Sequence, residues 1–190
     1  MLDMYITMMP LILGGILNMF FTKSGVYKKL NYPIDCNKNW IDGKRVFGDN
    51  KTWIGFISMI IICMFTQIIW GCFCDISCIN YRNELYLVND NTIIFNIIVG
   101  FLFGFTYMLF ELPNSFIKRR LDIKPGKTDK GVKGIFFVID QIDSLIGVFL
   151  VLMYLTGISF YEYINYLILG GITHIVVNLV LWIVKVRVNL

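Results

Sequence analysis

Five long apolar segments constrain the fold of this 190-residue chain more than any other feature. Each is close to the roughly 20 residues that an α-helix needs to cross a hydrocarbon core about 30 Å thick. Hydrophobic residues make up 57% of the chain, a larger fraction than in most soluble domains. We therefore predict an all-α integral membrane protein, a single domain over residues 1–190 with five transmembrane helices. The predicted spans are about 4–21, 53–73, 92–112, 134–156 and 163–184.

Positive charge is confined almost entirely to alternate connections between these segments. Lys and Arg residues are frequent between the first and second segments, between the third and fourth, and after the fifth, and Arg82 alone lies elsewhere. Connections rich in Lys and Arg remain on the cytoplasmic side of a membrane. The pattern therefore predicts an N-terminus outside the cell membrane, two long basic cytoplasmic loops and a cytoplasmic C-terminus.

Two carboxylates lie inside the fourth segment, where an unpaired charge is unfavourable. Asp140 and Asp143 are three residues apart, so they share one face of a helix. Charged groups in a bilayer usually face a cavity, an ion or one another. We interpret the pair as ligands of Mg²⁺, which leaves further coordination positions for water and phosphate oxygens. Ion pairs with the loop cations are the alternative.

The stretch from Asn114 to Arg120, Asn-Ser-Phe-Ile-Lys-Arg-Arg, comes directly after the third segment. Pro113 is predicted to end the helix, and Asn114 or Ser115 to cap a new element. The consecutive cations Lys118, Arg119 and Arg120 are interpreted as a cradle for a multiply charged anion beside the carboxylate pair. A surface patch for anionic lipid headgroups is the alternative interpretation.

The first basic connection offers a second place for phosphate. Gly43 and Gly48 flank its cations, and the residues that lead into the second segment are Asp49, Asn50, Lys51 and Thr52. Asp49 or Asn50 is predicted to cap that helix. A helix start that comes after Gly and carries Lys and Thr is typical of a phosphate site, although an ordinary capped helix entry has the same spacing. The P-loop pattern is absent.

The remaining polar and small residues of the segments are interpreted as structural. Asn18 and the stripe of Thr173, His174 and Asn178 are expected to hydrogen-bond between helices. The glycines at 14, 15, 104, 170 and 171 suit close helix contacts. Apolar packing is favoured over a disulfide for the cysteines at 72, 74 and 78. One histidine in the whole chain argues against a Ser-His-Asp triad or a His-based zinc site.

Taken together, the motifs resemble the signature region of the CTP-dependent lipid-phosphate cytidylyltransferases. The phosphatidate enzymes of that superfamily carry a Ser-x-x-Lys-Arg block and a later Asp-Arg-x-Asp-Ser. This chain has Ser115 to Arg119 and Asp140 to Ser144, with Gln141 in place of the Arg. It also has Pro125 where those enzymes have an Asp after a second Lys. The chain is more similar to the CDP-archaeol synthase branch of the superfamily in four respects. These are the two departures, the five spans and the stretch from Asp42 to Trp53.

The resemblance implies transfer of CMP from CTP to unsaturated archaeol phosphate, an isoprenoid ether lipid, with Mg²⁺ and release of pyrophosphate. It implies metal binding by Asp140 and Asp143 and triphosphate binding by Lys118, Arg119 and Arg120. Residues 49–52, with Asn114 and Ser115, are expected to complete a nucleotide site that faces the cytoplasm. Asp129 is a candidate replacement for the family carboxylate that Pro125 displaces.

Three alternatives remain at this point. The first is the same chemistry on phosphatidic acid, because recognition of lipid chains is apolar and leaves little trace in a sequence. The second is a small ion or anion transporter, although the chain has no internal repeat and its charge lies in the cytoplasmic half. The third is a non-catalytic scaffold, in which the Asp pair would have no purpose. We expect no nucleic-acid partner, and the sequence leaves the oligomeric state open.

Overall fold

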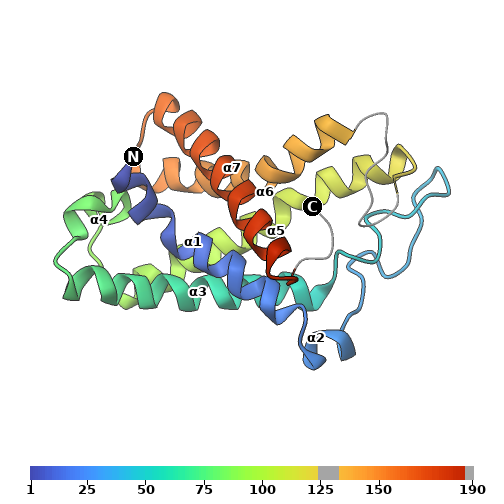
Figure 1. Ribbon diagram of the computed structural model, residues 1–190, viewed down its shortest axis with the longest axis horizontal. Helices are drawn as coiled ribbons and strands as arrows, with labels where there is room; N and C mark the ends of the chain where they lie inside the picture. Colours follow the sequence, from blue (N-terminus) through green and yellow to red (C-terminus); the bar gives the residue numbers. More distant parts are fainter. Residues whose placement is uncertain (124–132, 187–190) are drawn as a thin grey trace.

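The computed structural model describes residues 1–123 and 133–186, and these residues form a bundle of helices (Figure 1). Five helices are long and apolar enough to cross a membrane, so the predicted all-α architecture with five candidate spans is confirmed. They are α1 (Leu2–Phe21), α3 (Trp53–Ile76), α5 (Ile93–Arg120), α6 (Lys133–Thr156) and α7 (Phe160–Ile183). The short elements are α2 (Gly25–Lys29), the 3₁₀ helix η1 (Asn80–Arg82) and α4 (Glu84–Val88).

Helix α5 is longer than its sequence suggests, because it continues through Pro113 to Arg120. The predictions that Pro113 ends the helix and that Asn114 or Ser115 caps a new element are therefore wrong. Proline removes one backbone hydrogen bond from a helix. In α5, contacts of the last two turns with α6 and with the first basic loop compensate for this lost bond. Asn114 and Lys118 bond to α6, and Arg120 bonds to the first basic loop. At 1.5 Å per residue, the 28 residues of α5 extend about 42 Å, longer than a hydrocarbon core.

Two glycines allow α5 to lie directly against the backbone of α3. A Cβ atom on Gly100 would lie 2.5 Å from the Met64 Cα, and one on Gly104 would lie 2.6 Å from the Ile60 Cα. The four-residue spacing places both glycines on one face, the arrangement that permits close approach of spanning helices. The expected contact at Gly104 is therefore present, and Gly100 adds to it. Gly15 makes no such contact, since a Cβ atom there would have no described neighbour within 4 Å.

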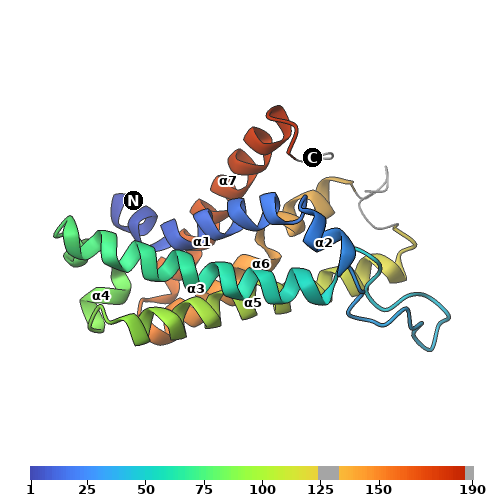
Figure 2. The same cartoon turned by 90° about the horizontal axis from the view of Figure 1, so that it is seen from below.

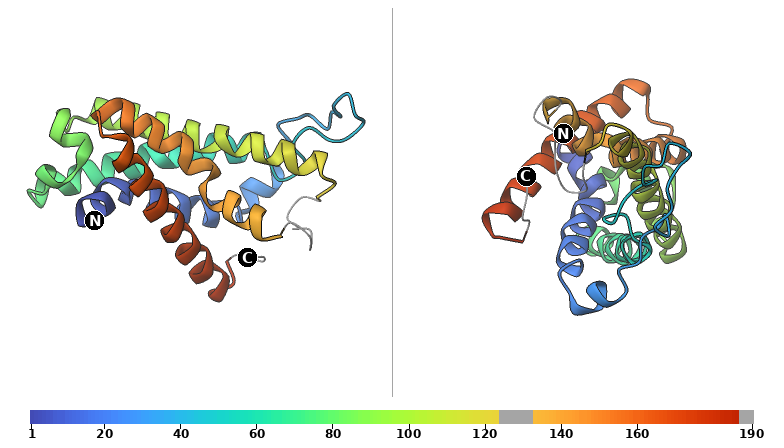
Figure 3. Two further views of the ribbon diagram at one scale, coloured as in Figure 1. Left: turned by 90° about the horizontal axis from the view of Figure 1, so that it is seen from above. Right: turned by 90° about the vertical axis from the view of Figure 1, so that its right-hand side faces the viewer.

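The other long helices complete a bundle with two chemically different ends. Helix α6 packs against α5, and α7 packs against α6 and α1 while diverging from the other long helices toward its C-terminus (Figures 2 and 3). The loop between α2 and α3 lies at the same end of the bundle as the C-terminal end of α5, whereas α4 lies at the opposite end (Figure 1). The tertiary structure thus brings two basic stretches together.

Hydrogen bonds between the spanning helices involve the polar residues singled out above. Asn18 accepts a hydrogen bond from Ser58 of α3 at 2.8 Å. Asn178 donates to the Gln141 side chain at 2.9 Å, and the His174 ring lies 3.1 Å from the Gln141 carbonyl. Thr173 donates to the Tyr5 hydroxyl. The prediction of interhelical bonding is confirmed for these residues, and the five cysteines are free thiols.

The first basic loop is built around the buried carboxylate of Asp35. Arg45 donates to both of its oxygens, at 2.7 and 3.2 Å, and the backbone N–H groups of Phe47 and Gly48 donate at 3.0 and 2.9 Å. Burial opposes ionisation of this carboxylate, but the hydrogen bonds from Arg45, Gly48 and Phe47 outweigh it and lower the pKa of Asp35 to about 2. Asp35 therefore fixes the loop that leads to Asp49 and Lys51.

We expect Asp35→Asn to loosen this loop. Because the folded pKa is lowered from 3.8 to about 2, the ionised carboxylate contributes about 2 kcal/mol above roughly pH 4, and this is lost as the pH falls through about 2. At pH 7.5, hydrogen exchange of the Phe47 and Gly48 amides should be roughly 30-fold faster in the variant. Asp49→Asn, which removes a 69% exposed carboxylate, is the matched control. Equal protection in both variants would refute this role.

Candidate active site

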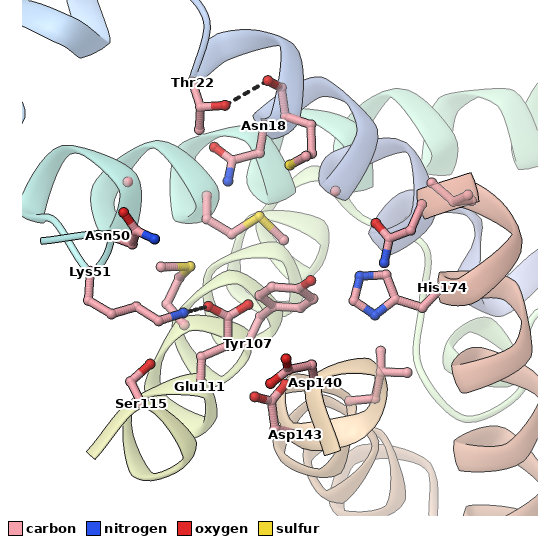
Figure 4. Close-up of a pocket in the computed structure, with 18 of the residues that line it drawn as sticks. Asn18, Thr22, Asn50, Lys51, Tyr107, Glu111, Ser115, Asp140, Asp143 and His174 are labelled. Atoms are coloured by element: carbon pink, nitrogen blue, oxygen red, sulfur yellow. Dashed lines mark hydrogen bonds and ion pairs between the residues drawn. The ribbon is translucent and has the colours of Figure 1, made fainter. Parts of the chain in front are cut away.

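A cavity of about 740 Å³ lies within the bundle, between α1, α3, α5, α6 and α7 (Figure 4). Ten of the eleven site residues predicted from the sequence line it, including residues more than ninety positions apart. Arg120 is the one that lies outside the lining. The ten are Asp49, Asn50, Lys51, Thr52, Asn114, Ser115, Lys118, Arg119, Asp140 and Asp143.

The carboxylate pair of α6 is held by side chains from α5. The Asn114 amide nitrogen donates to Asp140 Oδ1 at 2.7 Å and to Asp143 Oδ2 at 2.6 Å. Lys118 Nζ forms an ion pair with Asp140 and lies 2.5 Å from Oδ2. Asn114 and Lys118 are one helical turn apart, so one face of α5 supplies both groups. The alternative interpretation of the Asp pair, an ion pair with a basic residue, is therefore realised for Asp140 in this arrangement.

Lys51 and Glu111 form a second ion pair across the cavity, between the start of α3 and α5 (Figure 4). Burial alone would lower the pKa of Lys51, but the carboxylates of Glu111, Asp143 and Asp140 raise it, so Lys51 carries a positive charge. Glu111 was not predicted from the sequence. Glu111 lies three residues before Asn114 and seven before Lys118, so the three side chains share one face of a continuous helix. This spacing was missed because the helix was expected to end at Pro113.

The two arginines at the end of α5 have different surroundings. Nε and Nη1 of Arg119 are buried in the cavity wall and have no hydrogen-bond partner among the residues that the structure describes. Nη1 of Arg120 is also buried without a hydrogen-bond partner among the described residues, but Arg120 forms an ion pair with Asp42 at 2.7 Å, and its Nη2 donates to the carbonyls of Lys44 and Arg45. Its guanidinium also lies over the Phe116 ring. Arg119 is thus available to an anion, whereas Arg120 fastens the first basic loop to α5.

The start of α3 contributes to the cavity in a different way from that expected. Thr52, rather than Asp49 or Asn50, is its N-cap: the hydroxyl accepts from the Gly55 N–H at 3.2 Å and contacts the Tyr27 hydroxyl at 3.0 Å. The predicted caps, Asp49 and Asn50, were wrong because α3 begins at Trp53, directly after Thr52, and Asp49 is bound by Arg45 at 2.9 Å. Lys51 comes directly before this cap, so the capped start of α3 holds its side chain in position to pair with Glu111.

The deeper part of the cavity is apolar. On α5, α6 and α1 the lining residues change from polar to apolar with distance from the basic end of the bundle. A ligand that fits this cavity would carry charge at one end and hydrocarbon at the other. The apolar lining includes Met8, Leu11, Met59, Met108, Leu145 and Phe149.

The oxygen donors of the carboxylate pair are of the kind that Mg²⁺ prefers. Mg²⁺ prefers oxygen ligands and is usually held by one or two carboxylates together with substrate phosphates. Asp140 and Asp143 provide the carboxylates, and the Asn114 side chain faces them with its amide nitrogen rather than its oxygen. Within residues 1–123 and 133–186, no three His, Cys, Asp or Glu side chains form a metal-binding group, so the protein itself would supply few ligands. Asp129 and Pro125 lie outside the described residues.

The fold and the site together define the class of this protein. It is a multi-pass membrane protein whose charged site lies inside the helical bundle. The sequence profile of the CarS-like CDP-archaeol synthase family matches residues 2–190. The chain belongs to this family. The family predicted from the sequence motifs is therefore confirmed, and with it the class of enzyme, a CTP-dependent cytidylyltransferase.

Individual relatives agree with this assignment. The CDP-archaeol synthase of Sulfurisphaera tokodaii is 27% identical over 165 residues, which cover 86% of this chain and 84% of the relative. That of Pyrococcus furiosus is 34% identical over 114 residues, 58% of each chain. A solved structure of an intramembrane enzyme for archaeal membrane lipids biosynthesis superposes with a TM-score of 0.62 and 18% identity over 92% of both chains. That likeness supports the fold.

Gln141, the departure from the phosphatidate enzymes, has a structural role in this chain. The residue is 5% exposed, and its side chain lies between α6 and α7, where it accepts from Asn178 and donates to the Phe137 carbonyl. It is absent from the cavity lining. A neutral residue fits this buried position because a charge there would need a partner on α7.

Proposed function

We propose that this protein transfers CMP from CTP to a membrane lipid phosphate in an Mg²⁺-dependent reaction. The preferred substrate is unsaturated archaeol phosphate, 2,3-bis-O-geranylgeranyl-glycerol 1-phosphate, and the products are CDP-archaeol and pyrophosphate. The observation that carries the proposal is a single cavity that joins a carboxylate pair and basic residues to an apolar chamber between spanning helices. Family membership supports the reaction and favours it over a transporter.

The chemistry requires positioning and charge neutralisation rather than a catalytic base. The lipid phosphate is already anionic at neutral pH, so its oxygen attacks the α-phosphorus of CTP and the bond to the β-phosphate oxygen breaks. Lys118 and the unpartnered donors of Arg119 would bind the triphosphate and the leaving pyrophosphate. Lys51 and Asn50 would form the opposite wall. Asp140 and Asp143 would hold Mg²⁺, which when bound neutralises charge on the phosphates.

We further propose that the site faces the cytoplasm, where CTP is available. Lys51 comes directly before the N-cap of α3, and Lys118 lies in the last turn of α5, at the end of the bundle where the loop between α2 and α3 also lies (Figure 1). Connections rich in Lys and Arg remain on the cytoplasmic side. The chains of the lipid would occupy the apolar part of the cavity, with the lipid phosphate near the level of Asn114. This places both reacting phosphates at the polar end.

A direct assay tests the proposed function. Purified protein in detergent receives CTP labelled at the α-phosphate, Mg²⁺, and either the geranylgeranyl ether lipid phosphate or phosphatidic acid. We expect label in the organic phase with the ether lipid and little with phosphatidic acid. Preference for phosphatidic acid would show that the substrate is an ester lipid phosphate. Absence of product from a folded sample with either lipid would overturn the proposal and revive a transport function.

A further inference from the structure

The ammonium group of Lys118 engages the carboxylate that a metal ion at this site would require. Both oxygens of Asp140 lie 2.5 Å from Lys118 Nζ. The Lys118 side chain is only 13% exposed, and the ammonium lies 5.5 Å from the centre of the Phe136 ring. This cation is therefore a well-enclosed partner of Asp140 rather than a solvated surface lysine.

One ammonium cannot serve Asp140 and a phosphate group at the same time. A divalent cation on Asp140 and Asp143 would lie within a few ångströms of the Lys118 ammonium, and the two would repel strongly where little water screens them. Lysine carries its charge on a flexible four-carbon stem, so the ammonium can change partner without movement of α5. Lys118 lines the same cavity as Arg119, which gives it a polar space into which to turn.

The second lysine of the cavity provides an internal comparison. Lys51 pairs with Glu111, which lies on α5, outside the carboxylate pair of α6. Metal binding by Asp140 and Asp143 does not require that ion pair to break. The two lysines carry the same charge within one cavity, but only Lys118 competes directly for a carboxylate of the pair.

We propose that Lys118 is an exchangeable counter-cation: it neutralises Asp140 until a divalent cation binds, and the cation then releases it to the phosphates of the nucleotide. The proposal rests on the proposed function, which supplies both the metal carboxylates, Asp140 and Asp143, and the nucleotide that receives Lys118. Metal binding and triphosphate binding are then coupled through one side chain, and each favours the other. Unpaired intramembrane carboxylates are also avoided before the substrates bind.

Binding of Mn²⁺ alone, without nucleotide or lipid, tests this exchange. Detergent-purified protein is titrated with Mn²⁺, and free Mn²⁺ is followed by electron paramagnetic resonance. Lys118→Gln should bind Mn²⁺ about tenfold more tightly than the wild type, because a charge-assisted competitor has been removed. Lys51→Gln, the matched control, removes the same charge from the same cavity but frees no carboxylate of the pair, so it should strengthen Mn²⁺ binding clearly less than Lys118→Gln does. Lys118→Arg keeps the competitor and should stay near the wild type.

Thermal stability gives an independent readout. Without divalent cations, Lys118→Gln should unfold at a lower temperature than the wild type, and saturating Mn²⁺ should raise its midpoint by more than it raises that of the wild type. Mn²⁺ binding by Lys118→Gln no tighter than by Lys51→Gln would overturn the exchange while leaving the proposed reaction in place. Failure of the wild type and Lys118→Gln alike to bind Mn²⁺ would overturn the exchange together with the metal assignment.

Discussion

Asp143→Asn is expected to reduce turnover by at least about 10³-fold, the largest effect on activity that we anticipate for a single substitution. The change removes one carboxylate of the α6 pair, Asp140 and Asp143, and keeps the size of the side chain. Asn114 already donates to this position at 2.6 Å, and the amide oxygen of an asparagine can accept the same hydrogen bond. The fold should therefore survive. The measurement is label transfer from CTP to the ether lipid phosphate.

A matched control separates loss of the site from a general effect of charge. Asp3→Asn makes the same chemical change in the first turn of α1, at the opposite end of the bundle, where the carboxylate is 53% exposed and 3.7 Å from Arg82. Its turnover should stay within about twofold of the wild type, since exposed ion pairs contribute little. Wild-type activity in Asp143→Asn would remove the carboxylate pair from the mechanism.

Gly100→Ala is expected to have the largest effect on stability. The added methyl group would lie 2.5 Å from the Met64 Cα and 2.7 Å from the Cys63 carbonyl oxygen, so the backbones of α3 and α5 must separate. Overpacking of this kind typically costs about 1–3 kcal/mol, and backbone atoms cannot move aside as a flexible side chain can. The thermal unfolding midpoint in detergent, measured at one scan rate, should fall by several degrees.

Gly15→Ala is the control for this effect, because it introduces the same methyl group into another spanning helix where no described atom lies within 4 Å. Its midpoint should match that of the wild type or exceed it slightly, since alanine favours the helix. Similar midpoints for both variants would show that α3 and α5 are not held at their closest approach. Separation of these helices should also weaken the ion pair between Lys51 and Glu111, which joins the start of α3 to α5.

Several features of the fold and the site can be predicted from the sequence because they depend on local chemistry. About twenty apolar residues can form a spanning helix whatever their neighbours, so all five spans could be predicted within a few residues except at the end of α5. Asp140 and Asp143 were recognisable as site residues because a charge within an apolar segment is unfavourable unless a cavity, an ion or another charge stabilises it. The family could be predicted because its motifs are short and contiguous.

The partners of the charged residues were decided by the tertiary structure alone. The pairing of Lys118 with Asp140, the role of Glu111 opposite Lys51, and the use of Arg120 to fasten a loop all join segments far apart in the chain. Pro113 misled for the same reason: a local signal for a helix end was outweighed by contacts of Asn114 and Lys118 with another helix. A sequence specifies which residues are charged and apolar, whereas long-range packing selects which charges meet.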